Sequence, residues 1–200
     1  LKKQGVELIV TVDCGITGVD ETAYAATLGV DLVITDHHEC KSELPQAIAL
    51  VDPHRKDQPQ PVTEMAGVGV AFKLAAAIEG EQETLLDQYC DFLCLGTVAD
   101  VMPLTGENRT MVARGLKALE NPRRVGIAAL MAECSVQKGP VTAGTIGYTL
   151  APRINAAGRM GEVGIATELF LTHDAGRAVE LAGALCRLNR RRQEIESSIY

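Results

Sequence analysis

The sequence predicts an α/β fold in which a small parallel sheet is followed by a largely helical second half. Three observations lead to this prediction. Strand and helix patterns alternate over the first 54 residues, each strand pattern ends in Asp or His, and only helical patterns follow. Because parallel strands need a crossover between them, strands joined by helical segments imply a parallel sheet.

The strand patterns lie at 6–12, 31–35 and 47–51. The first is mostly apolar and β-branched, which is typical of a buried strand, and it follows Gly5. A helix is expected over 18–28 because Gly29 provides its stop. The strands run into Asp13-Cys14-Gly15, Asp36-His37-His38 and Asp52-Pro53-His54. Ligands of open parallel sheets bind outside the carboxyl ends of the strands, so these polar groups are expected to converge.

Helical patterns fill the second half, at 68–78, 84–95, 109–120, 125–133, 143–150, 162–171 and 175–200. The last has an apolar stripe, a cluster of arginines at Arg187 and 190–192, and no stop signal. We interpret it as the start of a connector to a further domain, which gives domains at 1–174 and 175–200. The alternative is a terminal helix packed on the same domain.

Composition excludes several classes of protein. Hydrophobic residues make up 46% and charged residues 22%, so the chain is neither disordered nor fibrous, and no apolar run reaches the ~20 residues of a membrane span. The net charge of −7 argues against coating nucleic acid by charge alone, and 4% aromatics without Trp argue against a base-stacking platform. None of the six cysteines forms C-x-x-C, so we expect reduced, buried thiols rather than a zinc ribbon.

One group of residues is suited to binding a metal ion: Asp13, Asp36, His37, His38 and Asp100. Carboxylates and imidazoles together suit Mn²⁺, Mg²⁺ or Zn²⁺, and a divalent cation would remove the repulsion between the acids. Such a cation activates water, and two of them could clamp a phosphate. The alternative is that each Asp caps a helix and each His lies unengaged at the surface.

Four blocks resemble the motifs of the DHH phosphoesterase superfamily: residues 10–15, 33–38, 95–109 and 151–159. The second contains the Asp-His-His triplet that names the superfamily. The last, Ala-Pro-Arg-Ile-Asn-Ala-Ala-Gly-Arg, is similar to the RecJ family of single-strand-specific 5′→3′ DNA exonucleases. The resemblance implies a Rossmann-like three-layer DHH domain and a two-metal phosphodiesterase using Mn²⁺ or Mg²⁺.

The resemblance also implies roles for single residues. Asp13, His37 and Asp100 resemble metal ligands, and Asp36 is expected to orient a neighbouring His. His38 is expected to contact the scissile phosphate. Four further residues resemble substrate-binding groups: Arg109, Arg153, Asn155 and Arg159. A surface salt bridge is the alternative for Arg159.

Two interpretations remain open for each of two smaller motifs. Gly67 and Gly69 form either a phosphate loop or, as we favour, a close helix contact. His54 and Arg55 either touch the substrate or cap their loop.

The superfamily's first motif, Asp-x-Asp, does not occur before Asp13. We therefore expect these 200 residues to be an internal fragment, binding metal weakly and lacking exonuclease activity by itself. For the complete protein we expect a cytoplasmic monomer with no membrane association. It would act on single-stranded DNA with a 5′ end in recombination and repair, with single-strand-binding protein as a partner. Two alternatives remain: another DHH phosphoesterase, such as a nano-RNase or cyclic dinucleotide phosphodiesterase, and a non-catalytic DHH scaffold.

Overall fold

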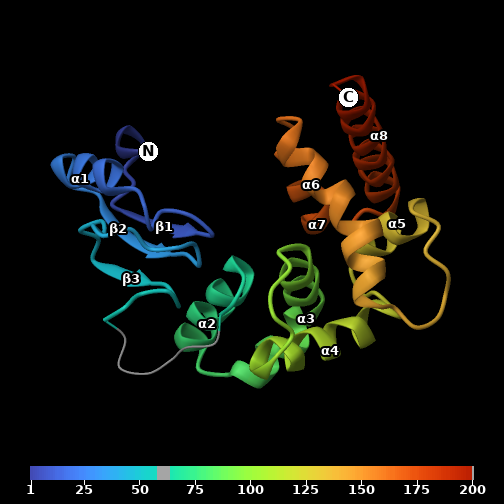
Figure 1. Ribbon diagram of the computed structural model, residues 1–200, viewed down its shortest axis with the longest axis horizontal. Coiled ribbons are helices and arrows are strands. Elements are labelled where there is room, and N and C mark those ends of the chain that lie inside the picture. Colours follow the sequence, from blue (N-terminus) through green and yellow to red (C-terminus); the bar gives the residue numbers. More distant parts are fainter. Residues whose placement is uncertain (58–63, 200) are drawn as a thin grey trace. The chain divides into compact units, whose positions relative to one another are not determined.

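The chain folds into two compact units, Leu1–Val112 and Ala113–Tyr200, each with its own core. The computed structural model describes residues 1–57 and 64–199 (Figure 1). The final residue of the predicted last helix, Tyr200, lies outside this range.

The first unit contains the predicted parallel sheet, in the order β1-β2-β3. Its elements are η1 (Lys2–Gln4), β1 (Leu8–Val12), α1 (Val19–Thr27), β2 (Asp31–Thr35), β3 (Ala49–Val51), α2 (Gly67–Glu79) and α3 (Gln82–Ala99). Helix α4 (Gly106–Leu119) begins in this unit and ends in the second. The α/β prediction is therefore confirmed, and the three strands lie within the predicted ranges.

The strand register brings the predicted polar residues to one edge of the sheet. Val12 pairs with Thr35, and Thr35 pairs with Val51, so all three strands end at the same level. The next residues extend this alignment: Asp13 N–H donates to the Thr35 carbonyl and Asp36 N–H to the Val51 carbonyl, both at 3.0 Å. Asp13, Asp36 and Asp52 consequently leave the sheet side by side.

The prediction that the first strand is buried is wrong. Exposure alternates along β1, and Leu8, Val10 and Val12 are 52%, 45% and 50% exposed. Helix α2 packs on β1 and β2, whereas α1 contacts β2. The described part of the chain therefore covers only one face of β1, although its apolar sequence suits burial on both.

The second unit is helical. It contains α5 (Val125–Glu133), the π-helix η2 (Thr145–Leu150), α6 (Ala151–Arg159), α7 (Val163–Leu171) and α8 (Ala175–Ile199). Helix α8 packs against α5, α6 and α7, and its Leu181, Ala182 and Leu185 are buried. The N-terminal half of α8 therefore belongs to the core of the second unit. That α8 connects this unit to a further domain stays a prediction.

Helix α6 was not predicted, because Pro152 suggests an interruption. The proline stands in the first turn of α6, where its missing N–H costs little. The π-turn before it leaves the Thr149 carbonyl to the side chain of Arg153, whose Nη1 donates to it at 2.6 Å. The helical path therefore continues through the proline.

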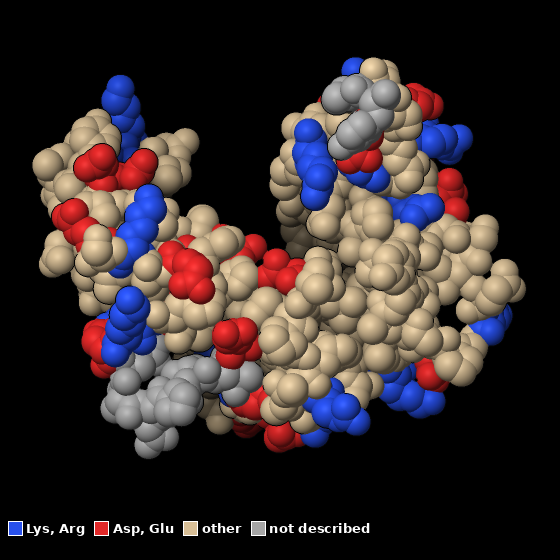
Figure 2. Space-filling model, in the orientation of Figure 1, with Lys and Arg blue, Asp and Glu red and all other residues tan. Residues whose placement is uncertain are grey.

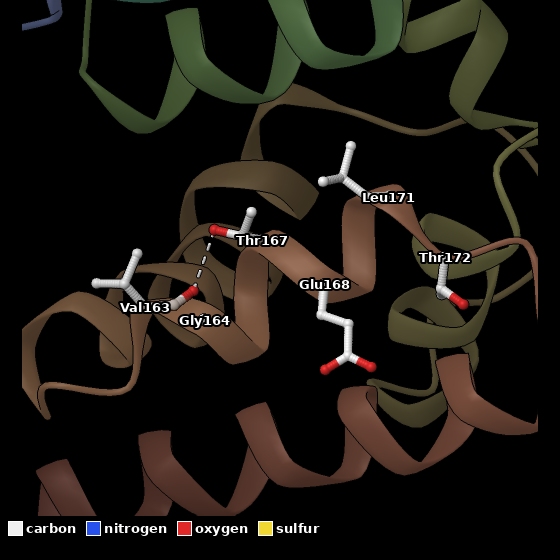
Figure 3. A pocket seen from close by; sticks show the side chains of 6 residues that line it. All are labelled: Val163, Gly164, Thr167, Glu168, Leu171 and Thr172. Atoms are coloured by element: carbon white, nitrogen blue, oxygen red, sulfur yellow. Dashed lines mark hydrogen bonds between the residues drawn. The ribbon is translucent and has the colours of Figure 1, made fainter. Parts of the chain in front are cut away.

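An open hollow on α7 is lined by Val163, Gly164, Thr167, Glu168, Leu171 and Thr172 (Figure 3). Within it Thr167 donates to the Val163 carbonyl, while Glu168 pairs with Arg177 of α8. None of the predicted site residues lines this hollow. In the part of the chain that is described, no helix is long and apolar enough to cross a membrane.

The tight packing of Gly126 against α7 generates a stability prediction. A Cβ at Gly126 of α5 would lie 1.8 Å from the Leu169 carbonyl oxygen of α7. We expect Gly126→Ala to lower the free energy of unfolding by about 2–3 kcal/mol, because the helices must separate. Gly164→Ala, at a helical glycine that faces open space, is the matched control and should be neutral or stabilising by up to about 1 kcal/mol. Urea denaturation measures both, and equal stabilities would contradict the packing described.

Candidate metal centre

One imidazole nitrogen faces two carboxylates at the carboxyl edge of the sheet. His37 Nε2 lies 2.9 Å from Asp13 Oδ1 and 3.3 Å from Asp100 Oδ2. The His37 side chain is 10% exposed, whereas those of Asp13 and Asp100 are 59% and 47% exposed. The predicted meeting of these three distant residues is therefore confirmed.

Asp13 is held by an unusual backbone and by a glycine. Its φ of +64° lies in the left-handed region, which Asp tolerates better than most residues. The first residue of α2, Gly67, is buried against it: a Cβ there would lie 2.2 Å from Asp13 Oδ1. Gly69 packs on Met65, where a Cβ would meet the Met65 Cβ at 3.1 Å. Both glycines therefore permit close packing, but against Asp13 and Met65, which lie outside the helices, and not against a neighbouring helix as expected.

Asp36 is the buried organiser of the centre. It is 1% exposed and accepts hydrogen bonds from Ile16 N–H at 2.9 Å, His37 N–H at 2.8 Å and the His38 ring Nδ1 at 2.7 Å. Burial alone would raise the pKa of Asp36, but these hydrogen bonds outweigh burial and lower it. The Ile16 contact has no sequence signal, because every residue except proline carries a backbone N–H.

His38 is fixed by Asp36 but remains accessible. Its side chain is 60% exposed, and a ring nitrogen lies within 4.8 Å of the facing ligand atoms of Asp13 and His37. The hydrogen bond that the His38 ring donates to Asp36 raises the pKa of His38, and the charges of Asp13 and Asp100 act in the same direction. Asp36 thus orients His38, as expected from the motif.

Asp100 reaches the centre because α3 ends in a strained turn. The turn is closed by Val101 N–H donating to the Val98 carbonyl and Met102 N–H to that of Thr97, at 3.1 Å each. Val101 occupies the position where glycine is usual, with a φ of +58°. Two of the three non-glycine residues with positive φ in the chain's described part, Asp13 and Val101, therefore belong to or adjoin this centre.

The loop after β3 is mostly self-contained. Asp52 accepts the His54 N–H at 2.7 Å, and burial raises the pKa of Asp52. The His54 ring lies 3.9 Å from Glu64 Oε1. Arg55 donates to the Leu50 carbonyl and pairs with Asp57. Of the two open interpretations of Arg55, these contacts favour loop capping.

The predicted substrate-binding residues differ in exposure. Arg109, Asn155 and Arg159 are exposed, and Asn155 and Arg159 lie one turn apart on α6. Arg153 is half-buried, bound to Thr149, and its Nε has no hydrogen-bond partner among the described residues. Arg109 belongs to the first unit and the other three to the second.

Charge is divided unequally between the two units. The first holds 18 acidic and 7 basic side chains and the second 8 acidic and 12 basic, which gives formal net charges of −11 and +4. On the face drawn in Figure 2, basic and acidic side chains alternate and do not merge into one basic surface. The overall acidity of the chain is therefore a property of the unit that carries the metal centre.

The donor set fits a hard or borderline divalent cation. The carboxylates of Asp13 and Asp100 face the His37 imidazole, and among the described residues the ligand atoms that all lie within 4.8 Å of one another belong to Asp13, His37 and His38. The six cysteines, all free, are not part of this group. Mixed oxygen and nitrogen ligands suit Mn²⁺ and Mg²⁺ better than the sulfur-preferring ions. Burial of the thiols is confirmed for Cys90 and Cys94, whereas Cys14 is exposed.

Known proteins share the sequence and the fold of this chain. Residues 2–97 match the model of the DHH family, N-terminal domain. The chain is 42% identical over 199 residues to the single-stranded-DNA-specific exonuclease RecJ of Bacillus subtilis, covering 100% of this chain and 25% of that protein. A crystal structure of Thermus thermophilus RecJ in complex with Mn²⁺ superposes with a TM-score of 0.84 at 38% identity, covering 96% of this chain and 29% of that one. A Mg²⁺ complex from the same organism gives 0.72 at 35%, covering 96% and 27%.

The contact between Gly67 and Asp13 generates a prediction about metal binding. Gly67→Ala forces a methyl group into the space of the Asp13 carboxylate, so we expect the affinity for Mn²⁺ to fall by about tenfold or more. Electron paramagnetic resonance of free Mn²⁺ measures this in a titration. The control is Gly164→Ala in the second unit, where an added Cβ would meet nothing within 4 Å, and this variant should keep the affinity of the parent. Equal affinity of both variants would show that Asp13 is not a ligand.

Proposed function

Because this chain carries the N-terminal domain of the DHH family at residues 2–97 and is homologous to RecJ proteins along its length, we propose that it is the catalytic core of a metal-dependent DNA exonuclease. The exonuclease would be specific for single strands and would act in the 5′→3′ direction. The observation that carries the proposal is the position of His37 Nε2 between the carboxylates of Asp13 and Asp100. The chain spans 25% of the length of RecJ from B. subtilis, 36% of that from Escherichia coli and 37% of that from Salmonella typhimurium.

Asp13, His37 and Asp100 would hold Mn²⁺ or Mg²⁺, of which the complete enzyme uses two. When bound, the cation supplies positive charge for the phosphate and lowers the pKa of its water toward about 7 in the best cases. His37 would offer Nε2 as a ligand, and the two carboxylates would balance the charge of the cation. These residues place the reacting groups at the carboxyl edge of the sheet.

His38 contributes a proton rather than a lone pair. Its Nδ1 is held by Asp36, and the raised pKa keeps the ring protonated over a wider pH range. A protonated imidazole beside the metal site donates to a non-bridging phosphate oxygen and stabilises the negative charge that develops there. His38 is therefore the substrate-facing partner of the metal ligands.

The substrate is a strand of DNA with a free 5′ end, held through its phosphates. Arg109, Arg153, Asn155 and Arg159 supply the contacts, and the net charge of +4 on the second unit favours a polyanion. Arg153 contributes by stabilising the turn before α6 as well. In cells this activity serves recombination and repair in the cytoplasm, with single-strand-binding protein as a partner and the enzyme acting as a monomer.

Substrate choice tests the proposal against the other DHH phosphoesterases. The complete protein, assayed with Mn²⁺, should release mononucleotides from 5′-labelled single-stranded DNA and leave blunt duplex intact. Preference for dinucleotides or cyclic dinucleotides would overturn the exonuclease assignment. The 200-residue chain alone is expected to be inactive.

Removal of Asp100 tests the metal site. In the complete protein Asp100→Ala should lower turnover by more than about a hundredfold, since it removes a direct ligand. Because Asp100 is half-exposed at the end of α3, the melting temperature should remain close to that of the parent. Turnover within a factor of two of the parent would show that Asp100 does not act in the reaction.

Removal of Arg159 tests the DNA contact. Arg159→Ala should weaken binding of single-stranded DNA and reduce the slope of log K against log salt by about 0.7, the value for one phosphate contact. The matched control is Arg177→Ala in the same unit, because Glu168 and Glu180 already neutralise Arg177. The same slope for Arg159→Ala and the parent would contradict the contact.

A further inference from the structure

A buried asparagine links the segment that packs against Asp13 to the segment that carries Asp100. Asn108, in the first turn of α4, is 1% exposed. Its Nδ2 donates to the Glu64 carbonyl at 2.7 Å and to the Pro103 carbonyl at 3.0 Å. The opposite amide orientation would place Oδ1 against two carbonyl oxygens, so the assignment of nitrogen and oxygen is fixed by its partners.

Each carbonyl lies three residues from a contact of the centre. Three residues after Glu64 is Gly67, which is buried against the Asp13 carboxylate. The intervening Met65 and Ala66 are 4% and 3% exposed, so this stretch is firmly packed. A displacement of Glu64 would therefore be transmitted to Gly67 and to Asp13.

Three residues before Pro103 is Asp100, at the end of α3. The turn between them holds Val101 in the left-handed region, a conformation that a β-branched residue adopts only when its surroundings enforce it. The hydrogen bond from Asn108 to Pro103 is one such constraint, because it fixes the chain immediately after the turn. Asn108 thus restrains both carboxylates that face His37.

We propose that Asn108 is a positioning residue of the metal centre, which sets the separation of Asp13 and Asp100 by binding the Glu64 and Pro103 carbonyls together. The proposal rests on the proposed metal-dependent function. Asparagine suits this role because its amide nitrogen offers two N–H donors on a short side chain. Aspartate has the same shape but would oppose both carbonyls with an acceptor.

A salt bridge in the same place supports the link. Glu107, which precedes Asn108, pairs with Lys73 of α2, so the first turn of α4 contacts α2 as well as the segment before it, where Asn108 binds the Glu64 carbonyl. The ion pair is partly exposed and contributes little by itself. The buried amide is therefore the contact that determines the geometry.

The test measures Mn²⁺ affinity by electron paramagnetic resonance, and turnover against Mn²⁺ concentration, in the complete protein. We expect Asn108→Ala to raise the dissociation constant of Mn²⁺ by about tenfold or more, and Asn108→Asp by at least as much. Saturating Mn²⁺ should restore most of the turnover of Asn108→Ala, which a loss of folded protein would not permit. The control is Asn189→Ala, a buried asparagine of α8 in the other unit, which should keep the Mn²⁺ affinity of the parent.

The possible failures are distinguishable. If the parent protein binds no Mn²⁺, the metal centre is wrong and this proposal falls with it. If the parent binds Mn²⁺ and folded Asn108→Ala binds it within a factor of two, the positioning role alone is overturned. Should Asn108→Ala not fold, Asn108→Ser, whose hydroxyl keeps one donor, replaces it. An intermediate affinity then supports the role, and the affinity of the parent overturns it.

Discussion

The buried carboxylate of Asp36 is the interaction on which the metal centre depends. A carboxylate without solvent is costly unless its oxygens are hydrogen-bonded, and this one is satisfied by Ile16 N–H, by His37 N–H and by the backbone and ring of His38. These donors come from the turn after β1 and from the turn after β2. Asp36 therefore joins the two turns that carry Asp13 and His37, and the parallel register of the strands brings them to the same level. The sheet provides the alignment, and Asp36 converts it into a defined arrangement of side chains.

The charge distribution separates two tasks between the units. The first unit has a formal charge of −11 and places two carboxylates against one imidazole nitrogen, an arrangement that a divalent cation stabilises. The second unit, at +4, carries the arginines expected to bind phosphate. A net charge of −7 for the whole chain conceals this division. The acidity that argues against unspecific nucleic-acid binding is consistent with a metal-dependent enzyme acting on nucleic acid.

The sequence was sufficient to predict what depends on local patterns. Strand ends are marked by a change from apolar to polar residues, so Asp13 and His37 could be placed at one edge of a parallel sheet, and the family motifs added Asp100. Contacts of the backbone could not be predicted in this way: the Ile16 N–H that binds Asp36 has no distinctive side chain. The hydrogen bond from Asn108 to the Glu64 carbonyl joins residues that are 44 positions apart in the sequence. Asn108 lies in the polar first turn of a helix, and that stretch of sequence does not indicate that Asn108 is buried or which carbonyls it binds. The exposed face of β1 was mispredicted because an apolar composition does not show how much of a strand its neighbours cover. The helix through Pro152 was missed because proline is tolerated in a first helical turn.

The central claim is that Asp13, His37 and Asp100 share a divalent cation. The most direct measurement is anomalous diffraction at the manganese edge from crystals of the complete protein grown with Mn²⁺. A peak within bonding distance of His37 Nε2 and of both carboxylates is the predicted result. A peak elsewhere, or no peak from crystals grown with saturating Mn²⁺, would contradict the claim and remove the basis for a metal-dependent nuclease.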